Sequence, residues 1–341
     1  MQDFISYKSQ ITDFLTEFLK RKQQKQSASY FSKDVFERIL PLAISGKMLR
    51  GSLLINTFGK LSRKKFTQEV LQAAVALELA QTGFLIHDDI IDRDELRRGQ
   101  VTLQHQYAQR AQKRKYRQCA HSGVSLAICA GDIVFFLVYE LLPTTLIKLF
   151  SLQFGMTALG EMHDVELALM SGKKVIKGDI LQMYLDKTAS YSVCLPLMAG
   201  SVLADQHDEI LIQLNELGKI LGLIFQIKDD ELGLFGDTKS TGKPVGADIR
   251  EGKKTLYYYY LLQTVDDKTK ILKSFSKRNL NDGEVGKILD LIEKLKIKEV
   301  VNKDLESLDT QASQRINDLS VLPEFKQMMF QFLDMVANRV R

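Results

Sequence analysis

Proline is rare in this chain, which limits the kinds of structure that it can form. Only five prolines occur in 341 residues, so long segments can continue as helix without interruption. Six apolar residues of the segment 210–230 fall on one broad helical face, namely Ile210, Leu214, Leu217, Leu221, Ile224 and Phe225. The stretch TLYYYYLLQTV, residues 255–265, admits a strand, but its flanks favour a helix. The sequence predicts an all-α protein, a large helical bundle forming a single domain over residues 1–341.

The bulk composition sets the broad class of the chain. Hydrophobic residues make up 45% and charged residues 26%, an ordinary globular balance that allows a sizeable core. The net charge of +5, from 47 basic and 42 acidic residues, suits anionic partners without naming one. Residues 109–117, QRAQKRKYR, form a basic run, but no nucleic-acid-reading element lies beside it. We expect a solvated face there and no nucleic-acid partner.

The cysteines and the N-terminal sequence predict a cytoplasmic location. The three cysteines are an odd count without metal-like spacing, which is typical of reduced thiols. The N-terminal segment carries charges throughout and holds no apolar signal core. No stretch approaches the roughly 18 uncharged apolar residues of a membrane span. We therefore expect a cytoplasmic protein without a transmembrane segment.

An apolar segment, LQAAVALELAQTGFLI, runs directly into a dense group of charges, HDDIIDRDELRRG, within residues 71–99. On a helix, Asp88 and Asp92 lie one turn apart, with Asp89 on the flank. Three carboxylates so placed repel one another, and exposed salt bridges to the following arginines would contribute only about 0–1 kcal/mol. A divalent cation compensates better, and Mg²⁺ commonly bridges carboxylates to substrate phosphates.

The same arrangement recurs later in the chain, where Asp229 and Asp230 follow the apolar segment ending in LGLIFQIK. Each aspartate pair has a glutamine before it on the same face, Gln81 for the first and Gln226 for the second. A loop rich in glycine and lysine, within residues 233–255, suits close approach to phosphate, although it is not a P-loop. Two such helices predict one cavity with an apolar floor, which suits a hydrocarbon tail with a diphosphate head.

Seven short motifs make the chain similar to a known family. In order they are SGKMLRG, DDIID, RRG, GEMHDVE, KTASY, FQIKDDELGLFGD and GKPVGADIREGKKTL. The chain resembles the trans-polyprenyl diphosphate synthases, which join isopentenyl diphosphate to an allylic diphosphate. One such motif is a weak signal, but seven in the right order, from about residue 40 to 255, are specific. The resemblance implies the isoprenoid synthase fold with a central apolar cavity, and a homodimer.

The resemblance also implies roles for individual residues. Asp88, Asp89 and Asp92 would bind Mg²⁺ on one side of the allylic diphosphate, and Asp229 and Asp230 on the other. Further contacts to that diphosphate would come from Arg97, Lys187, Lys243 and Lys253. Thr188 and Gln226 would line the reacting end. The isopentenyl diphosphate would be held by Lys47, Arg50, Gln81 and Arg98.

The implied chemistry is ionisation, condensation and elimination. Three Mg²⁺ ions per site, with Mn²⁺ as a substitute, and the cationic side chains would stabilise the charge on the leaving diphosphate. An apolar floor shields the carbocation from water. The departed diphosphate is the base usually proposed for this family, so no catalytic histidine is required.

The chain departs from the family's pattern at several positions, including Gln81, where histidine is frequent, and the segment 106–121, which is longer and more basic than expected. Met48 stands where arginine is common, and Gly51 where proline is common. Glu161 replaces a frequent glutamine, and Gly233 stands where many members have a third aspartate. These departures leave a non-catalytic partner subunit as an alternative, although such subunits usually lose an aspartate motif outright.

Product length in this family depends on side chains that precede the first aspartate on its helix, one to three turns below it. Here they are Phe84, Gly83, Ala80 and Leu77. The bulk of Phe84 argues against a very long product, and Gly83 and Ala80 leave room beside it. This pattern favours a twenty-carbon product, geranylgeranyl diphosphate, over a fifteen-carbon one. The alternative is that Phe84 packs in the core without affecting product length.

A second alternative is a class I terpene cyclase on the same fold. Such an enzyme would share the first aspartate cluster and the apolar floor. It would not need Lys47, Arg50 and the second arginine of RRG, because it binds no isopentenyl diphosphate. Their presence favours a short-chain prenyltransferase that uses dimethylallyl, geranyl and farnesyl diphosphates.

Overall fold

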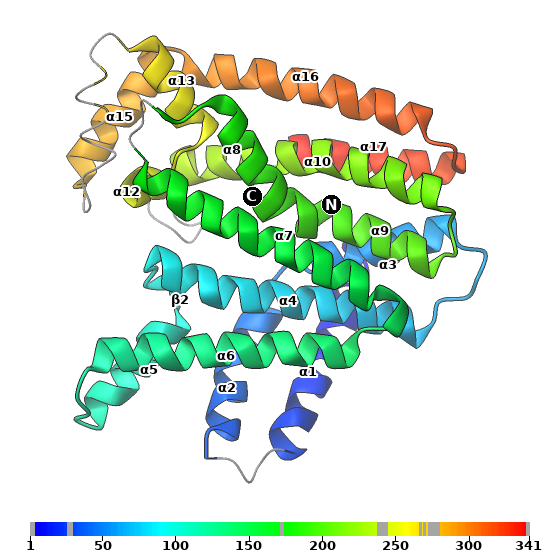
Figure 1. Ribbon diagram of the computed structural model, residues 1–341, viewed down its shortest axis with the longest axis horizontal. Helices are drawn as coiled ribbons and strands as arrows, with labels where there is room; N and C mark the ends of the chain where they lie inside the picture. The colour runs from blue at the N-terminus through cyan, green and yellow to red at the C-terminus, as the bar shows by residue number, and fades with distance from the viewer. Residues whose placement is uncertain are drawn as a thin grey trace. The chain divides into compact units, whose positions relative to one another are not determined.

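The chain folds almost entirely into helices, as its helical periodicity predicts (Figure 1). The computed structural model describes residues 4–25, 30–170, 174–236, 245–265, 268, 271 and 280–338. Within these residues the only sheet is a two-stranded hairpin, so the predicted all-α class is confirmed.

The chain divides into two compact units. The first comprises Met1–Lys148 with Ala199–Asp205, and the second comprises Leu149–Met198 with Gln206–Arg341. The single domain expected over residues 1–341 stays a prediction. Cys119, Cys129 and Cys194 are free thiols, and the cytoplasmic location also stays a prediction.

The first unit is built around one buried helix. Its elements are α1 (Lys8–Lys25), α2 (Ser32–Ile44), α3 (Leu49–Leu61), α4 (Gln68–Asp92), β1 (Leu96–Arg97), β2 (Gln100–Val101), α5 (Leu103–Lys113) and α6 (Cys119–Leu141). Helix α4 packs against α1, α2, α3, α5 and α6, and every residue from 73 to 83 is buried. A helix covered all round needs no polar face, which is why this segment is apolar without alternation.

The second unit is organised around α10 (Asp208–Phe235), which packs against η2, α8, α12, α16 and α17. Its other elements are α8 (Lys177–Tyr184), the π-helix η2 (Leu185–Cys194), α12 (Ala247–Glu251), α13 (Leu256–Thr264), α15 (Asp282–Lys294), α16 (Ile297–Asp318) and α17 (Pro323–Ala337). Helices α7 (Thr144–Leu169) and α9 (Leu195–Leu203) contribute residues to both units.

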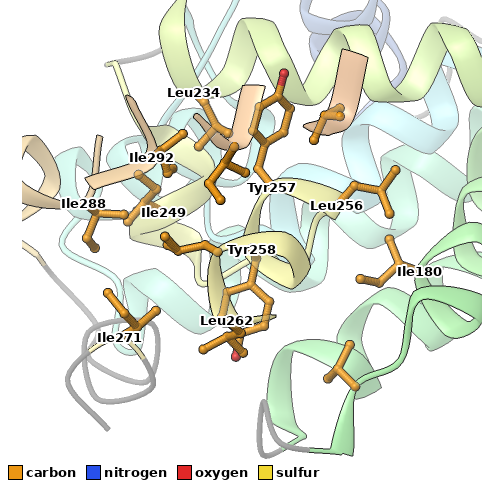
Figure 2. Packing of buried hydrophobic residues seen from close by; sticks show 14 of the residues in the cluster. Ile180, Leu234, Ile249, Leu256, Tyr257, Tyr258, Leu262, Ile271, Ile288 and Ile292 are labelled. Carbon is orange, nitrogen blue, oxygen red and sulfur yellow. The ribbon is translucent and has the colours of Figure 1, made fainter. Parts of the chain in front are cut away.

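The tyrosine-rich stretch is helix α13, as predicted. It begins after Thr255, whose hydroxyl accepts a hydrogen bond from the N–H of Tyr258 at 3.3 Å, an N-cap interaction. Tyr257 and Tyr258 belong to a buried cluster that also includes Leu234 and Ile249 (Figure 2). This cluster joins α10, α12 and α13 to the helices that follow them.

The π-helix η2 packs so closely on its neighbours that only glycine fits at two contacts. A Cβ on Gly160 of α7 would lie 2.1 Å from the backbone nitrogen of Lys187, and one on Gly222 of α10 would lie 2.3 Å from Cβ of Ala189. These contacts fix the backbone that carries Lys187 and Thr188. Such π-helical turns inside α-helices often occur at functional sites.

Three helices, α4, α6 and α10, are long and apolar enough to cross a membrane by length and composition alone. The most apolar window of α4 is 72% buried inside the structure, that of α10 is 50% buried and that of α6 is 39% buried. The expectation that no stretch approaches a membrane span is therefore wrong for these helices, and the absence of a transmembrane segment stays a prediction.

We expect Gly160→Ala to destabilise the protein by about 1–3 kcal/mol, because the added methyl group meets backbone atoms of η2 that cannot move aside. Urea denaturation monitored by circular dichroism measures the change. Gly155→Ala on the same helix is the control, since nothing lies within 4 Å of its Cβ and alanine favours helix. Equal effects of the two substitutions would contradict the close contact.

Candidate active site

A tight hairpin follows the aspartate-bearing end of α4. The helix ends at Arg93, which adopts a left-handed conformation with φ of 62°. In the hairpin, Arg97 pairs with Gln100, so Arg98 and Gly99 form a two-residue turn. Both turn residues have positive φ, 52° and 74°, the mirror-image geometry that suits such hairpins.

This hairpin sends two adjacent arginines to different partners. Arg97 binds the carboxylates of α4, with its Nη2 2.6 Å from Asp88 and its Nε 2.6 Å from Asp89. Arg98 instead donates from Nη1 to the hydroxyl of Ser45 at 3.0 Å, beside the segment that carries Lys47. The divergence follows from the turn, because Arg97 is the last residue of β1 whereas Arg98 has the left-handed backbone of the turn.

Arg97 is the internal counterion of the first carboxylate group. Its side chain is only 16% exposed, and it also reaches Asp94 at 3.3 Å. Burial raises the pKa of Asp89 to about 6, although Arg97 opposes that shift. The pKa of Arg97 is raised above its ordinary value. Burial acts to lower this pKa, but the attraction of the three carboxylates outweighs the effect of burial. The sequence predicts exposed salt bridges here, and that expectation is wrong, because the paired side chains are largely shielded from water.

A buried glutamate orders the N-terminus of α3. Glu78 on α4 accepts a hydrogen bond from the N–H of Gly51 at 2.8 Å, which satisfies one of the unpaired donors of a helix start. Burial raises the pKa of Glu78, while the charges of Arg50 and Arg98 lower it. Two of the three cations predicted for isopentenyl diphosphate, Arg50 and Arg98, thus lie within electrostatic reach of one carboxylate. Gln81 is buried one turn further along α4.

Two of the departures from the family pattern find a structural reason here. A proline at position 51 would lack the N–H that Gly51 donates to Glu78. A Cβ at the same position would lie 2.9 Å from Cδ1 of Ile11 and 3.0 Å from the carbonyl oxygen of Ala74. Met48 is 1% exposed, so a methionine packs where the family often has a charge.

In the second unit, hydrogen bonds join four side chains from α8, η2 and α10. The hydroxyl of Thr188 donates to Oε1 of Gln226 at 2.6 Å, and Nε2 of Gln226 donates to Asp230 at 2.7 Å. The Tyr184 hydroxyl donates to the other oxygen of Asp230 and accepts from the N–H of Leu256. The predicted pair Thr188 and Gln226 is therefore brought together and oriented.

Asp229 and Asp230 face different surroundings. Asp230 is 5% exposed, and burial raises its pKa well above the ordinary value, with the charge of Asp248 acting in the same direction. Its hydrogen bonds to Tyr184 and Gln226 oppose that shift. Asp229 is exposed, so it can reach a ligand in solvent.

The predicted lysines of the second unit are held by carboxylates. Lys187 pairs with Asp164 at 2.7 Å and with Glu161 at 2.8 Å, so the unusual glutamate is an ion-pair partner. Lys253 pairs with Glu251 at 2.9 Å. Lys243 lies outside the described residues.

Lys254, which follows Lys253, is buried. Its ammonium group lies over the ring of Tyr258, 4.6 Å from the ring centroid, and burial lowers its pKa to about 8.

Comparison with known proteins identifies the family. Residues 33–292 match the sequence model of the polyprenyl synthetase family. The chain belongs to the polyprenyl synthetase family. It is 33% identical over 261 residues to a short chain isoprenyl diphosphate synthase of Methanocaldococcus jannaschii, covering 74% of this chain and 73% of that protein. It is 30% identical over 310 residues to a geranylgeranyl diphosphate synthase of Sulfolobus acidocaldarius, covering 86% of each.

A solved structure agrees with this membership. The geranylgeranyl pyrophosphate synthase of Corynebacterium glutamicum, complexed with isoprenyl diphosphate and magnesium, matches with a TM-score of 0.89 at 25% identity over 98% of each chain. The protein is thus a short-chain prenyl diphosphate synthase, a transferase of prenyl groups, as the motifs predict. These relatives are synthases, which favours that activity over the cyclase and the partner subunit.

The carboxylates of the synthase fit Mg²⁺. Among the described residues, no three His, Cys, Asp or Glu side chains gather closely enough to hold a metal ion by themselves. Mg²⁺ usually takes one or two protein carboxylates and completes its octahedron with waters and substrate phosphates. Asp88 and Asp92 are half-buried and Asp229 is exposed, so each unit offers hard oxygen ligands.

The residues predicted to set the product length pack differently from expectation. Ala80 and Leu77 are fully buried, and Phe84 meets Phe135 of α6 edge to face, with ring centroids 5.0 Å apart. The room expected beside Gly83 is not empty, because a Cβ there would lie 3.0 Å from the same Phe135 ring. The sequence could not reveal this, since Phe135 lies 52 positions further along the chain.

Four contributing residues escaped the sequence analysis. They are Glu78, Phe135, Asp164 and Tyr184, which all act through contacts with distant parts of the chain. For two of these residues, a neighbouring sequence motif could have indicated a role. Asp164 stands within GEMHDVE, and Tyr184 stands three residues before KTASY.

Proposed function

We propose that this synthase extends dimethylallyl, geranyl and farnesyl diphosphates with isopentenyl diphosphate and releases twenty-carbon geranylgeranyl diphosphate. The observation that carries the two-substrate reaction is the separation of the adjacent arginines. Arg97 lies with the α4 carboxylates, and Arg98 lies beside the segment of Lys47 and Arg50. Two distinct cationic positions suit two distinct diphosphates.

The allylic diphosphate would be bound through Mg²⁺ and cationic side chains. Asp88, Asp89 and Asp92 would hold Mg²⁺ on α4, and Asp229 and Asp230 on α10. When bound, three Mg²⁺ ions, or Mn²⁺ in their place, supply positive charge that stabilises the departing diphosphate. Direct donors to the same diphosphate would be Arg97, Lys187, Lys243 and Lys253.

Two of these cations are already held by carboxylates, Arg97 by Asp88 and Asp89 and Lys187 by Asp164. The ion pairs of Arg97 keep this cation close to the carboxylates that would bind the metal. Binding of a cation to the α4 carboxylates would release Arg97 toward the diphosphate.

Condensation would follow ionisation. Lys47, Arg50, Gln81 and Arg98 would hold isopentenyl diphosphate, whose double bond attacks the allylic carbocation. The hydroxyl of Thr188 and the amide of Gln226, fixed by Asp230, present oxygen dipoles that would stabilise that carbocation. The departed diphosphate would take the proton that completes the new double bond.

The first test is product analysis. We expect purified protein with Mg²⁺, isopentenyl diphosphate and each allylic primer to form an elongation series that ends at twenty carbons by mass spectrometry. Asp88→Asn should lower turnover about a hundredfold, because it removes one anionic ligand from the ionising site. Asp13→Asn, an exposed position on α1, is the control. A wild-type protein that elongates no primer contradicts the proposal, and cyclic hydrocarbon from a lone diphosphate favours the cyclase.

Product length is assigned to the aromatic pair formed by Phe84 and Phe135. The rings contact each other beside Gly83, so together they would close the path of the growing chain along α4. The relative from Sulfolobus acidocaldarius, a geranylgeranyl diphosphate synthase, supports the twenty-carbon assignment.

We expect Phe84→Ala and Phe135→Ala each to lengthen the product by at least one five-carbon unit, because each opens space at the floor. Chain length is read from the dephosphorylated products by mass spectrometry. Phe66→Ala, which removes the same atoms from a half-exposed position, should leave the product unchanged. An unchanged product from Phe84→Ala together with a lower melting temperature would assign Phe84 to core packing alone.

The proposal includes a homodimer, supported by exposed apolar residues on two helices. On α6 these are Ile128, Phe136 and Tyr139, which share one face. On α7 they are Leu152, Leu159, Met162 and Leu169, which form a second stripe. Exposed apolar surface of this kind marks interaction sites.

We expect the wild-type protein to elute with the mass of two 38.8 kDa chains in size exclusion with light scattering. Phe136→Glu should shift it to the mass of one chain, because a charge replaces a ring that is 75% exposed in the isolated chain. Leu322→Glu, at an exposed leucine before α17, is the control. A monomeric wild-type protein contradicts the dimer. A wild-type protein that sediments with lipid vesicles, when Phe136→Glu does not, would instead assign the apolar face of α6 to membrane binding.

A further inference from the structure

The basic run of the sequence, residues 109–117, leads from α5 toward α6 and is not part of the candidate active site. Four of its last five residues are cationic, namely Lys113, Arg114, Lys115 and Arg117. No Asp or Glu occurs in the sequence between Glu95 and Asp132. Residues 112–118 are all exposed, as expected for a solvated face. The turn between α5 and α6 is therefore a dense positive surface.

The backbone of this turn has a defined geometry. Helix α5 ends in a Schellman motif, in which the N–H of Tyr116 bonds to the carbonyl oxygen of Ala111 at 3.0 Å and the N–H of Lys115 bonds to that of Gln112 at 2.9 Å. Lys115 is left-handed, with φ of 55°, at the position that glycine usually occupies in this motif. A side chain there carries a steric cost that glycine avoids. The turn thus presents a cation where the backbone alone favours glycine.

The two helices that carry the turn pack closely within the first unit. Helix α5 folds back along α6, and the turn lies at their shared end (Figure 1). A Cβ on Gly123 of α6 would lie 2.3 Å from the carbonyl oxygen of Gln104, so the two helices meet at their backbones. Tyr107 and Ala111 of α5 are buried. The cations are therefore carried by an anchored helix pair.

Exposed aromatic rings border these cations. Tyr116 of the turn is 55% exposed, and Tyr30 and Phe31, directly before α2, are 66% and 40% exposed. Arg110 lies over the rings of Tyr30 and Phe31, 5.6 and 5.1 Å from their centroids, and Arg114 lies over Tyr30 at 5.8 Å. Both arginines also donate to the hydroxyl of Tyr30. Cationic groups and amphipathic rings are thus combined on one surface.

The carboxylate that meets these arginines is shared between two of them. Asp34 of α2 accepts from Arg38 at 2.9 and 3.1 Å and from Arg110 at 2.9 Å. One negative charge therefore faces two positive charges at the base of the surface. The lysines of the turn add further positive charge beyond this network.

We propose that this basic and aromatic surface docks the protein on an anionic lipid bilayer. Clustered lysine and arginine side chains are attracted to anionic headgroups, and tyrosine favours the boundary between headgroups and acyl chains. Docking of this kind lies on the bilayer and needs no spanning helix. The apolar face of α6 proposed for the dimer begins at Ile128, about 14 Å along the helix from Cys119, so the two surfaces are distinct.

Single-stranded nucleic acid is the competing partner for a surface of this composition. Its bases stack on open faces of aromatic rings. In this protein, guanidinium groups already lie over the rings of Tyr30 and Phe31. No nucleic-acid-reading element accompanies the basic run in the sequence. Dense charge without open stacking platforms favours the bilayer.

Sedimentation with lipid vesicles tests this surface. The probes are vesicles of phosphatidylcholine alone and vesicles that also contain phosphatidylglycerol, each at low and at high salt. The turn variant replaces three exposed cations, by Lys113→Gln, Lys115→Gln and Arg117→Gln. The control replaces three exposed lysines of α15 and α16, by Lys287→Gln, Lys294→Gln and Lys303→Gln. The two proteins have the same net charge, so the comparison isolates the position of the cations.

We expect the wild type and the control to bind the phosphatidylglycerol vesicles. The turn variant should bind them at least tenfold more weakly, because each basic residue near an anionic bilayer strengthens binding about fivefold. High salt should weaken the binding of all three proteins, since it screens the attraction. Lys115→Gly should bind about fivefold more weakly yet melt no lower than the wild type, because glycine suits the left-handed backbone.

Four outcomes overturn the inference. The wild type stays in solution with phosphatidylglycerol vesicles, or the folded turn variant binds them like the control. The wild type binds neutral vesicles equally well and keeps binding at high salt, which assigns the contact to an apolar surface instead. The wild type binds a single-stranded oligonucleotide but no vesicle, which assigns the surface to nucleic acid. The assay uses no substrate, so its result is independent of the proposed reaction.

Discussion

Carboxylates gathered at the ends of apolar helices are the constraint on which this structure depends. Like charges so close together in a partly dry environment raise the free energy of the fold unless something positive or hydrogen-bonding meets them. On α4 the compensation is electrostatic, because Arg97 lies among Asp88, Asp89 and Asp94. On α10 it is hydrogen bonding, because Tyr184 donates to Asp230. The same unfavourable charge density that the fold must offset is what suits these sites to Mg²⁺.

The two solutions have different consequences for ligand binding. In the proposed function, a metal ion would take the place of Arg97 on the α4 carboxylates, and the released arginine would turn to a diphosphate. Asp230 has both oxygens engaged and serves to orient Gln226 and, through it, Thr188. Asp229 is exposed, and the carboxylate of Asp248 on α12 lies beside Gly233 of α10.

Much of the site could be predicted from local sequence. Helix α4 and its terminal aspartates follow from apolar periodicity interrupted by charge, and the motif order places Lys187, Thr188 and Gln226 without a structure. The unusual residues were harder to interpret. Gly51 and Glu161 are departures in a motif, but their reasons are a contact with Glu78 and an ion pair with Lys187. Each partner lies more than 20 positions away, beyond what local patterns reveal.

The sequence by itself determined the helical class, the order of the motifs and the chemistry of their side chains, because helix formation and the spacing of residues within a helix depend on neighbours a few positions apart. The tertiary structure alone decided which distant groups share a space. Phe135 fills the room beside Gly83, and the carboxylate of Asp248 fills the room beside Gly233. A glycine in a sequence shows that a side chain is missing, but only close packing between helices determines which side chain takes its place.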